Sequence, residues 1–308
     1  NISDLIDYQS DLKSLERERQ LNIQYVEGKA WEQLSFGIST RDGKPTLLEN
    51  PILRQALASC IDREKIAGLR LDAGSVVDDF YLPGFRVGEQ VASDYSYLPA
   101  ESGLKIKELG WIDPDGDPAT PRISEGVDGI PDGRVLQFTL LAAETDKPPE
   151  AVEIIQENLG SCGIGVEIQY LPASELLAPG PEGPVFGRDF DLAYFAWAAG
   201  SYQPCRLFLS DEIPGLYPEF PKGWGGVNAP GYSNEDFDHA CRTVLTNLPD
   251  SAESLAALDE IQSIFRQELP ALPLFFRQDV IIVHPDLAGV ESGIFPLFWN
   301  IEGIEKIK

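Results

Sequence analysis

The side chains that most often carry chemistry near neutral pH are few and scattered in this sequence. Only two histidines occur, His239 in a predicted helix and His284 at the end of a predicted strand. Neither lies in an HExxH, HxxxH or Cys-His spacing, and the chain has no GxSxG or phosphate-binding loop motif. Because general acid–base and nucleophilic catalysis need such groups, the sequence predicts no catalytic residue, no metal and no cofactor, and a protein that is not an enzyme.

One acidic run, Asp113-Pro114-Asp115-Gly116-Asp117, has the alternating carboxylates from which calcium loops are built. It departs from the EF-hand pattern, since Pro118 stands where the sharp-turn glycine belongs and Ser124 where the bidentate glutamate belongs. A solvated surface loop is the expectation. A metal-assisted hydrolase that uses this loop is the less favoured alternative.

Aromatic side chains gather at one predicted strand, Asp191–Trp197, and in the loop that follows it. Tyr194, Trp197 and Tyr202 surround the end of this strand. In open α/β sheets, ligands bind beyond the carboxyl ends of the strands. Strand alternation places Tyr194 on the face opposite Phe195 and Trp197, so these three rings cannot all point toward one ligand.

The elements that would position these aromatics indicate the α/β class. Strands at Val135–Ala142 and Val166–Tyr170 flank a helix at Pro148–Leu159, a β-α-β unit with a crossover suited to parallel pairing. The strand Asp191–Trp197 is apolar almost throughout and is expected to be buried on both faces. Periodicity and capping residues predict further helices over 2–15, 51–61, 62–66, 99–109, 234–245 and 252–268, and further strands over 21–26, 33–38, 272–276 and 280–283, with loops over 73–99 and 113–133.

Length and charge restrict the classes of partner. The 308 residues are enough for two lobes, and 50 acidic against 24 basic side chains give a net charge of -26. Such a field repels phosphate backbones and anionic lipid surfaces, so nucleic acid and membrane-surface partners are not expected. No apolar run approaches the roughly 20 residues that cross a bilayer. The chain opens at Asn1 and contains no methionine, which suggests a processed or trimmed piece.

The four cysteines allow three fully paired connectivities. Cys205 and Cys241 both adjoin loops and are candidates for a disulfide in an oxidising compartment. Cys60 and Cys162 lie in apolar periodic segments and are expected to be small buried side chains. Neither a CxxC motif nor a Cys/His cluster suggests zinc.

Seven segments, taken in order, carry a resemblance to a known family. They are Trp31–Phe36 (WEQLSF), Asn50–Ile66 (NPILRQALASCIDREKI), Leu109–Asp117 (LGWIDPDGD), Ile155–Ile168, Asp191–Trp197, Asn234–Asp238 and Leu269–Phe275. Together they resemble the peptide/nickel-type (family 5) extracytoplasmic solute-binding proteins of ABC importers, whose corresponding patterns read WEHLDF, VRQAL..AIDRE.I and AGW.D.DGDG.

The resemblance implies a periplasmic-binding-protein type II clamshell with one lobe complete and the other partial. Residues 1–38 would be a remnant of lobe I, 39–275 would be lobe II, and 276–308 would return to lobe I. The implied function is capture of a small ligand, such as an oligopeptide or oligosaccharide, and its delivery to the transmembrane subunits of an ABC permease. The full-length protein would be an extracytoplasmic lipoprotein anchored to the membrane, and a monomer. A sensor or interaction protein of the same fold is the alternative.

The resemblance also implies a ligand-binding set in lobe II. Its members are Trp197, Tyr194, Tyr202, Gly200 and Ser201. In peptide binders of the family, an aspartate three positions after the strand-end tryptophan pairs with the free ammonium of the peptide. Gly200 occupies that position here. Without the carboxylate, a buried ammonium would lack its charged partner, so a neutral ligand, a capped ligand or a sugar is expected.

Overall fold

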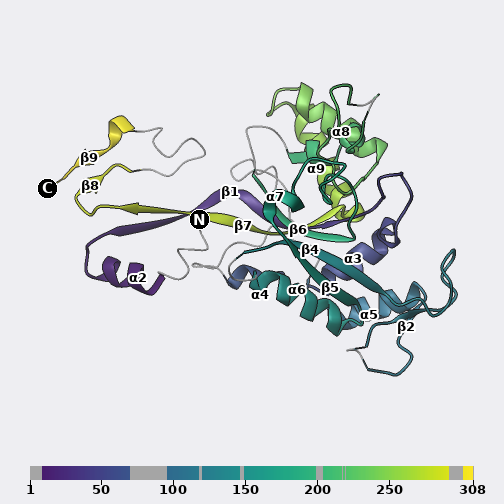
Figure 1. Cartoon of the computed structure of the whole chain (residues 1–308). Coiled ribbons are helices and arrows are strands. Elements are labelled where there is room, and N and C mark those ends of the chain that lie inside the picture. The colour runs from purple at the N-terminus through teal and green to yellow at the C-terminus, as the bar shows by residue number, and fades with distance from the viewer. Residues whose placement is uncertain are drawn as a thin grey trace.

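The computed structural model describes residues 9–69, 96–117, 120–145, 149–198, 204–216, 218, 220–290 and 301–307. Within them, a mixed five-stranded sheet carries helices on its faces, and a two-stranded ribbon projects from the sheet (Figure 1). The strand order in the sheet is β5 (Gly165–Leu171), β4 (Gln137–Ala143), β6 (Leu192–Ala198), β1 (Asn22–Phe36) and β7 (Ala271–Val283).

The helices and minor elements complete the described chain. The α-helices are α2 (Gln9–Arg17), α3 (Pro51–Ser59), α4 (Arg63–Gly68), α5 (Pro99–Glu108), α6 (Glu150–Ser161), α7 (Ala173–Leu176), α8 (Glu235–Thr246) and α9 (Ala252–Glu268). Short 3-10 helices are η1 (Leu47–Glu49), η2 (Pro204–Phe208), η3 (Ser210–Glu212) and η4 (Ile301–Gly303). Two small hairpins pair β2 (Trp111–Ile112) with β3 (Ile123–Ser124), and β8 (Leu287–Ala288) with β9 (Glu305–Lys306).

The predicted β-α-β unit is present. β4 pairs in parallel with β5 on one side and with β6 on the other, and α6 makes the crossover from β4 to β5. β1 runs antiparallel to both β6 and β7. The α/β class is confirmed, with a parallel half and an antiparallel half in one sheet.

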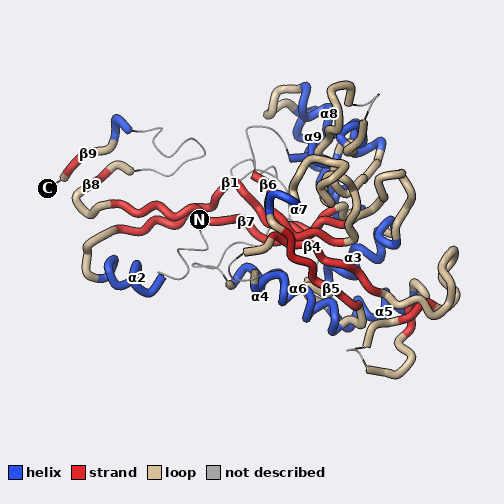
Figure 2. The backbone as a smooth tube through the Cα atoms, in the orientation of Figure 1, coloured by secondary structure: helices blue, strands red, loops and turns tan. Residues whose placement is uncertain are grey.

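β1 and β7 are longer than the sequence indicated. The predicted strands 21–26 and 33–38 are one continuous strand, as are 272–276 and 280–283. The prediction was wrong because Gly28 and Lys29 interrupt the apolar pattern, whereas the backbone pairing continues past them through a register shift between Glu27 and Trp31. The resulting ribbon reaches away from the helices and carries α2, β8 and β9 at its far end (Figure 2).

Three other predictions need revision or fall outside the described residues. The surface loop predicted over 113–133 contains β3, which pairs with β2. The first predicted helix is described from Gln9 and continues to Arg17, with its earlier part outside the described chain. Most of the loop predicted over 73–99 also lies outside the described residues.

The two faces of β6 belong to two apolar clusters. Leu192 and Tyr194 lie in the larger cluster, together with buried residues of α3, α5, α6, α8 and α9. Ala193 and Phe195 lie in a smaller cluster with Leu176 of α7 and the loop before β6. The predicted alternation along this strand is confirmed. Trp197, next to the end of β6, packs against both clusters.

Two disulfides join segments that are distant in sequence. Cys60 caps the end of α3 and Cys162 caps the end of α6, and their sulfurs are bonded at 2.05 Å. The expectation of two separate buried thiols is therefore wrong, because packing of the two helix ends brings the cysteines together. Cys205 of η2 is bonded to Cys241 of α8, the pair that the loop positions suggested.

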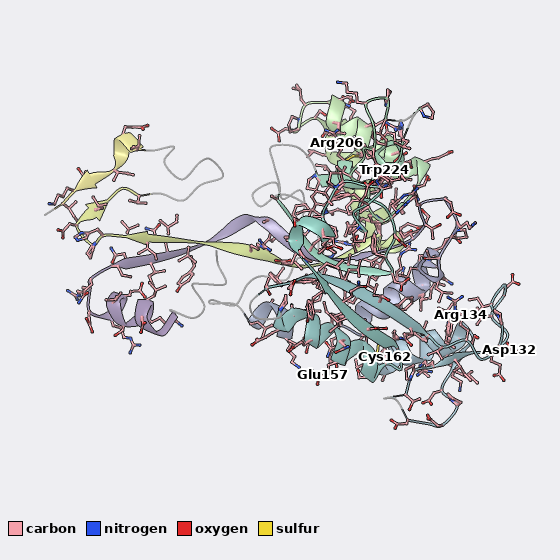
Figure 3. The ribbon with its side chains drawn as sticks, in the orientation of Figure 1. Asp132, Arg134, Glu157, Cys162, Arg206 and Trp224 are labelled. Carbon is pink, nitrogen blue, oxygen red and sulfur yellow. A yellow bond between two sulfur atoms is a disulfide. The ribbon has the colours of Figure 1, made fainter. Side chains whose placement is uncertain are left out.

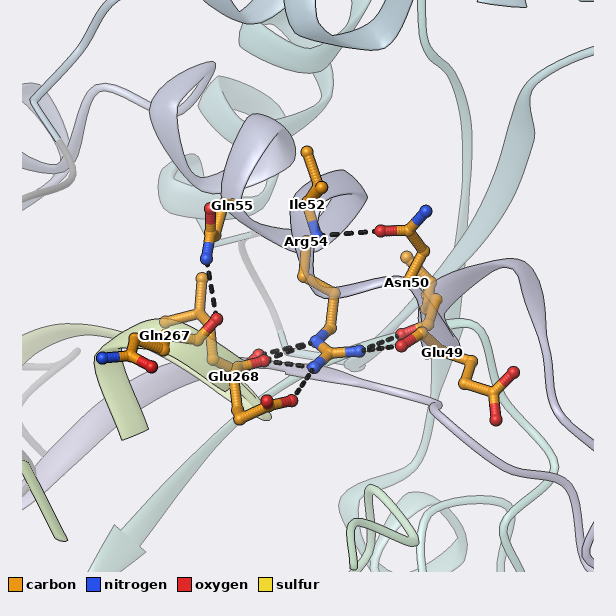
Figure 4. Close-up of polar contacts among 9 residues, drawn as sticks. Glu49, Asn50, Ile52, Arg54, Gln55, Gln267 and Glu268 are labelled. Atoms are coloured by element: carbon orange, nitrogen blue, oxygen red, sulfur yellow. Dashed lines mark hydrogen bonds and ion pairs between the residues drawn. The ribbon is translucent and has the colours of Figure 1, made fainter. Parts of the chain in front are cut away.

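A buried arginine ties α3 to the end of α9 (Figure 4). Arg54 is 1% exposed. Its guanidinium donates hydrogen bonds to the backbone carbonyls of Leu48 at 2.5 Å, Glu49 at 2.8 Å, Glu268 at 2.8 Å and Leu269 at 3.1 Å. The Glu268 carboxylate lies 3.5 Å away. The arginine of the family-like RQAL segment therefore satisfies carbonyls at the end of η1 and at the end of α9.

Candidate ligand-binding site

The candidate site lies where the parallel strands end. Since β4, β5 and β6 run in the same direction, their carboxyl ends meet at one edge of the sheet. Ala198 at the end of β6 pairs with Ala30 of β1. Beyond that point, from Glu27 back to Asn22, β1 pairs with β7 alone. The ribbon therefore leaves the five-stranded sheet at the same edge where an α/β sheet places its ligands.

Trp197 lies at this edge, one residue before the end of β6. It is partly buried and makes edge-to-face contacts with Phe195, at 5.8 Å between centroids, and with Phe186, at 6.0 Å. Its cross-strand neighbour Trp31 is fully buried and donates its indole N–H to Gln33 at 3.1 Å. These neighbours fix the Trp197 ring while part of it stays accessible, an arrangement suited to ring stacking.

The other residues of the predicted ligand set are placed differently. Tyr194 is 9% exposed and packs in the larger cluster. Its ring therefore belongs to the core and offers little surface to a ligand. Gly200, Ser201 and Tyr202 lie outside the described residues. On the far side of those positions the chain resumes in η2, which the Cys205–Cys241 disulfide fastens to α8.

A second tryptophan extends the aromatic surface. Trp224 (Figure 3) donates its indole N–H to the carbonyl of Phe186 at 2.9 Å. The Arg41 guanidinium lies 5.9 Å from the centre of the Trp224 ring. Arg41 also donates to the carbonyls of Gly187 at 3.0 Å and Pro181 at 2.7 Å. Three loops are thus fastened around Trp224 and joined to Trp197 through Phe186.

The partly buried Arg188 adds two hydrogen bonds to the contacts between these loops. It donates to the carbonyl of Arg41 at 2.8 Å and to the hydroxyl of Ser39 at 3.2 Å. Burial, and then the positive charge of Arg41, lower the pKa of Arg188. The glycine that leaves room for the Trp224 ring is Gly180, which is distant from Trp224 in the sequence. No local sequence pattern therefore links the two residues.

The groups considered for metal or acid–base chemistry are engaged locally. One oxygen of Asp113 accepts the backbone N–H of Gly116 at 2.9 Å, and one of Asp115 accepts that of Asp117 at 3.0 Å. Across the described part of the chain, no group of three or more His, Cys, Asp or Glu side chains is placed to hold a metal ion.

Comparison with known proteins decides the family. A family model for the middle region of bacterial extracellular solute-binding proteins, family 5, matches residues 3–210. The chain belongs to this family. Oligopeptide-binding protein AppA of Bacillus subtilis is 23% identical over 300 residues, which make up 95% of this chain and 50% of AppA. Di/tripeptide-binding protein 2 of Pseudomonas aeruginosa is 23% identical over 266 residues, 86% of this chain and 43% of that protein.

Solved structures of family members share the fold. AppA in complex with a nonapeptide has a TM-score of 0.71 at 21% identity, over 97% of this chain and 55% of AppA. NikA from Brucella suis with Fe(III)-EDTA has a TM-score of 0.72 at 16% identity, over 97% of this chain and 55% of NikA. The fold is therefore that of a periplasmic-type binding protein, and the chain spans about half the length of the relatives it matches. None of the described helices is long and apolar enough to cross a bilayer.

Proposed function

We propose that this chain is the ligand-capturing part of an extracytoplasmic solute-binding protein that presents an oligopeptide to the transmembrane subunits of an ABC importer and leaves it chemically unchanged. Membership of the solute-binding family supports the class of function. The observation that carries the proposal is the position of Trp197, half-open at the carboxyl edge where the β1–β7 ribbon leaves the lobe. A ligand there would lie between this lobe and whatever the ribbon carries.

The division of the chain into lobes forms part of this proposal. The family resemblance puts lobe II at residues 39–275, with 1–38 and 276–308 in the partner lobe. The pairing pattern supports a division within β7 close to residue 276, but in β1 it favours an earlier one. Ala30–Phe36 pair with β6 inside the five-stranded sheet, whereas Asn22–Glu27 pair with β7 alone, so the division in β1 is proposed near Glu27. Opening and closing of the cleft would then be a hinge motion of these two strands.

An oligopeptide is the proposed ligand because several of the solved relatives carry peptides, among them a nonapeptide in AppA and a pentapeptide in the oligopeptide-binding protein of Thermus thermophilus. The residue at position 200 restricts the kind of peptide. Gly200 offers no carboxylate to a free ammonium, so a peptide with a blocked or distant amino terminus is favoured over one whose ammonium is buried. An oligosaccharide or a metal chelate is the second choice.

The test is a thermal-shift screen of the full-length protein against free peptides, N-acetylated peptides, oligosaccharides and metal chelates. The proposal expects N-acetylated peptides to raise the melting temperature more than free peptides of the same sequence. Deletion of the gene should also abolish uptake of the stabilising ligand. Retained uptake would instead support a sensor or interaction protein, and conversion of any ligand would support an enzyme.

A further inference from the structure

The loop that carries Trp224 forms a pocket of its own beside the strand-end site. Its volume is about 290 Å³, and it is lined by Phe220, Pro221, Lys222, Gly223, Trp224 and Gly225. Two aromatic rings and a proline supply apolar walls, and the exposed Lys222 is the charged residue among those that line the pocket. This combination of apolar walls with a single charged group is typical of sites that orient small ligands.

The aromatic walls of the pocket are held in place. The Trp224 ring is fixed by its hydrogen bond to Phe186 and by Arg41. A Cβ on Gly180 would collide with the Trp224 indole nitrogen, so only glycine leaves room for the ring at that position. Likewise, a Cβ on Gly225 would come within 2.6 Å of the Phe220 ring. Rings fixed in this way lose little conformational entropy when a ligand binds.

The charge at the pocket contrasts with the rest of the molecule. The chain has a net charge of -26, yet two cations, Arg41 and Lys222, lie at the Trp224 loop. Within the described chain neither forms an ion pair with a carboxylate. The nearby carboxylate of Asp42 is paired with Lys44 at 2.5 Å. Lys222 is therefore available to an anionic group of a ligand.

We propose that the Trp224 pocket binds a planar apolar ring that carries a carboxylate, with the ring between Phe220 and Trp224 and the carboxylate at Lys222. In a peptide ligand this group would be an aromatic residue with a neighbouring carboxylate. The inference rests on the proposed function in that it treats the pocket as a continuation of the Trp197 surface through Phe186. It assigns to this surface a preference for anionic aromatic groups.

The experiment uses the whole chain and three probes, N-acetylphenylalanine, its carboxamide and N-acetylalanine. Binding is followed by the indole N–H signals of the five tryptophans, and the Trp224 signal is assigned by its loss in Trp224→Phe. N-acetylphenylalanine should shift the Trp224 signal with a dissociation constant of about 1 mM. The carboxamide should bind about threefold more weakly because it lacks the charge. N-acetylalanine should leave the signal unchanged because it lacks the ring.

Lys222→Gln removes the positive charge and keeps the fold, because Lys222 is exposed and its replacement does not change the packing of the core. This variant should bind N-acetylphenylalanine and its carboxamide equally. Lys105→Gln, an exposed lysine on α5, is the matched control and should keep the threefold preference. Three results would overturn the inference. They are the absence of a shift of the Trp224 signal, an equal shift with N-acetylalanine, and a preference for N-acetylphenylalanine over its carboxamide that persists in Lys222→Gln. The probes need only this pocket, so their failure to bind would refute the pocket and not the proposed peptide capture. If the probes bind but no peptide is captured, the proposed function alone would be refuted.

Discussion

Replacement of Arg54 by methionine removes a guanidinium from the interior while it keeps a side chain of similar length. Four backbone carbonyls lose their donor, and each buried acceptor left unsatisfied costs roughly 1 kcal/mol or more. The ion pair with Glu268, whose side chain is 36% exposed, adds little. The free energy of unfolding should therefore fall by about 4 kcal/mol.

Equilibrium urea unfolding of the purified chain measures this loss. The matched control is Gln55→Ala on the same helix, which removes one hydrogen bond to Gln267, at 2.7 Å near the surface, and should cost about 1 kcal/mol or less. Arg54→Lys should recover less than half of the loss, because a single ammonium cannot reach carbonyls that the planar guanidinium spans. If Arg54→Met unfolds at the same urea concentration as Gln55→Ala, Arg54 does not tie α3 to α9.

Three further perturbations address charge, covalent links and the ribbon junction. Because the net charge is -26, transfer from about 0.05 M to about 1 M NaCl should raise the melting temperature by about 5 °C through screening of the repulsion between carboxylates. A melting temperature that stays constant or falls as salt is added would contradict this. Conversion of Cys60 and Cys162 to serine opens a loop with a separation of 102 residues, so denaturant titration should show a loss of about 4.7 kcal/mol; a loss below about 1 kcal/mol would show that the bridge contributes little. Glu32, 4% exposed, accepts a hydrogen bond from Arg277 at 2.7 Å, and Arg277→Met should cost about 3 kcal/mol by leaving that carboxylate buried. A double-mutant cycle with Glu32→Gln would contradict the pairing if it gave a coupling near zero.

Local signals in the sequence were sufficient for much of the architecture. Asn50 followed by Pro51 predicted the start of α3, and in the structure the Asn50 side chain accepts the N–H of Ile52 at 2.9 Å. The β4–α6–β5 unit was predictable because its strands and helix each carry their own periodicity and its turns carry glycine. Helices and strands whose signals lie in neighbouring residues were predicted with the correct type, and their boundaries differ from the prediction by a few residues.

Features that depend on contacts between distant segments were missed. The bond between Cys60 and Cys162 depends on how the ends of α3 and α6 pack, which no local pattern encodes. The position of the Trp224 ring depends on the meeting of three loops, around residues 41, 181–187 and 220–225. The strand-end position of Trp197 could be predicted because apolar runs and alternation are local, whereas the burial of Tyr194 in the larger core depends on the helices that cover that face.

Calorimetric titration of the full-length protein and its Trp197→Ala variant with the best peptide from the thermal-shift screen tests the central claim most directly. Leu248→Ala, which changes a side chain that is 79% exposed on the loop after α8, is the control and should bind as the parent does. Trp197→Ala should lose affinity at least tenfold, about 1.4 kcal/mol. It should stay folded, with a lower melting temperature in the absence of ligand because the contacts with Phe186 and Phe195 are lost. Equal affinity in the two proteins, or a Trp197→Ala variant that fails to fold, would assign this ring to the core and contradict a ligand site at the end of β6.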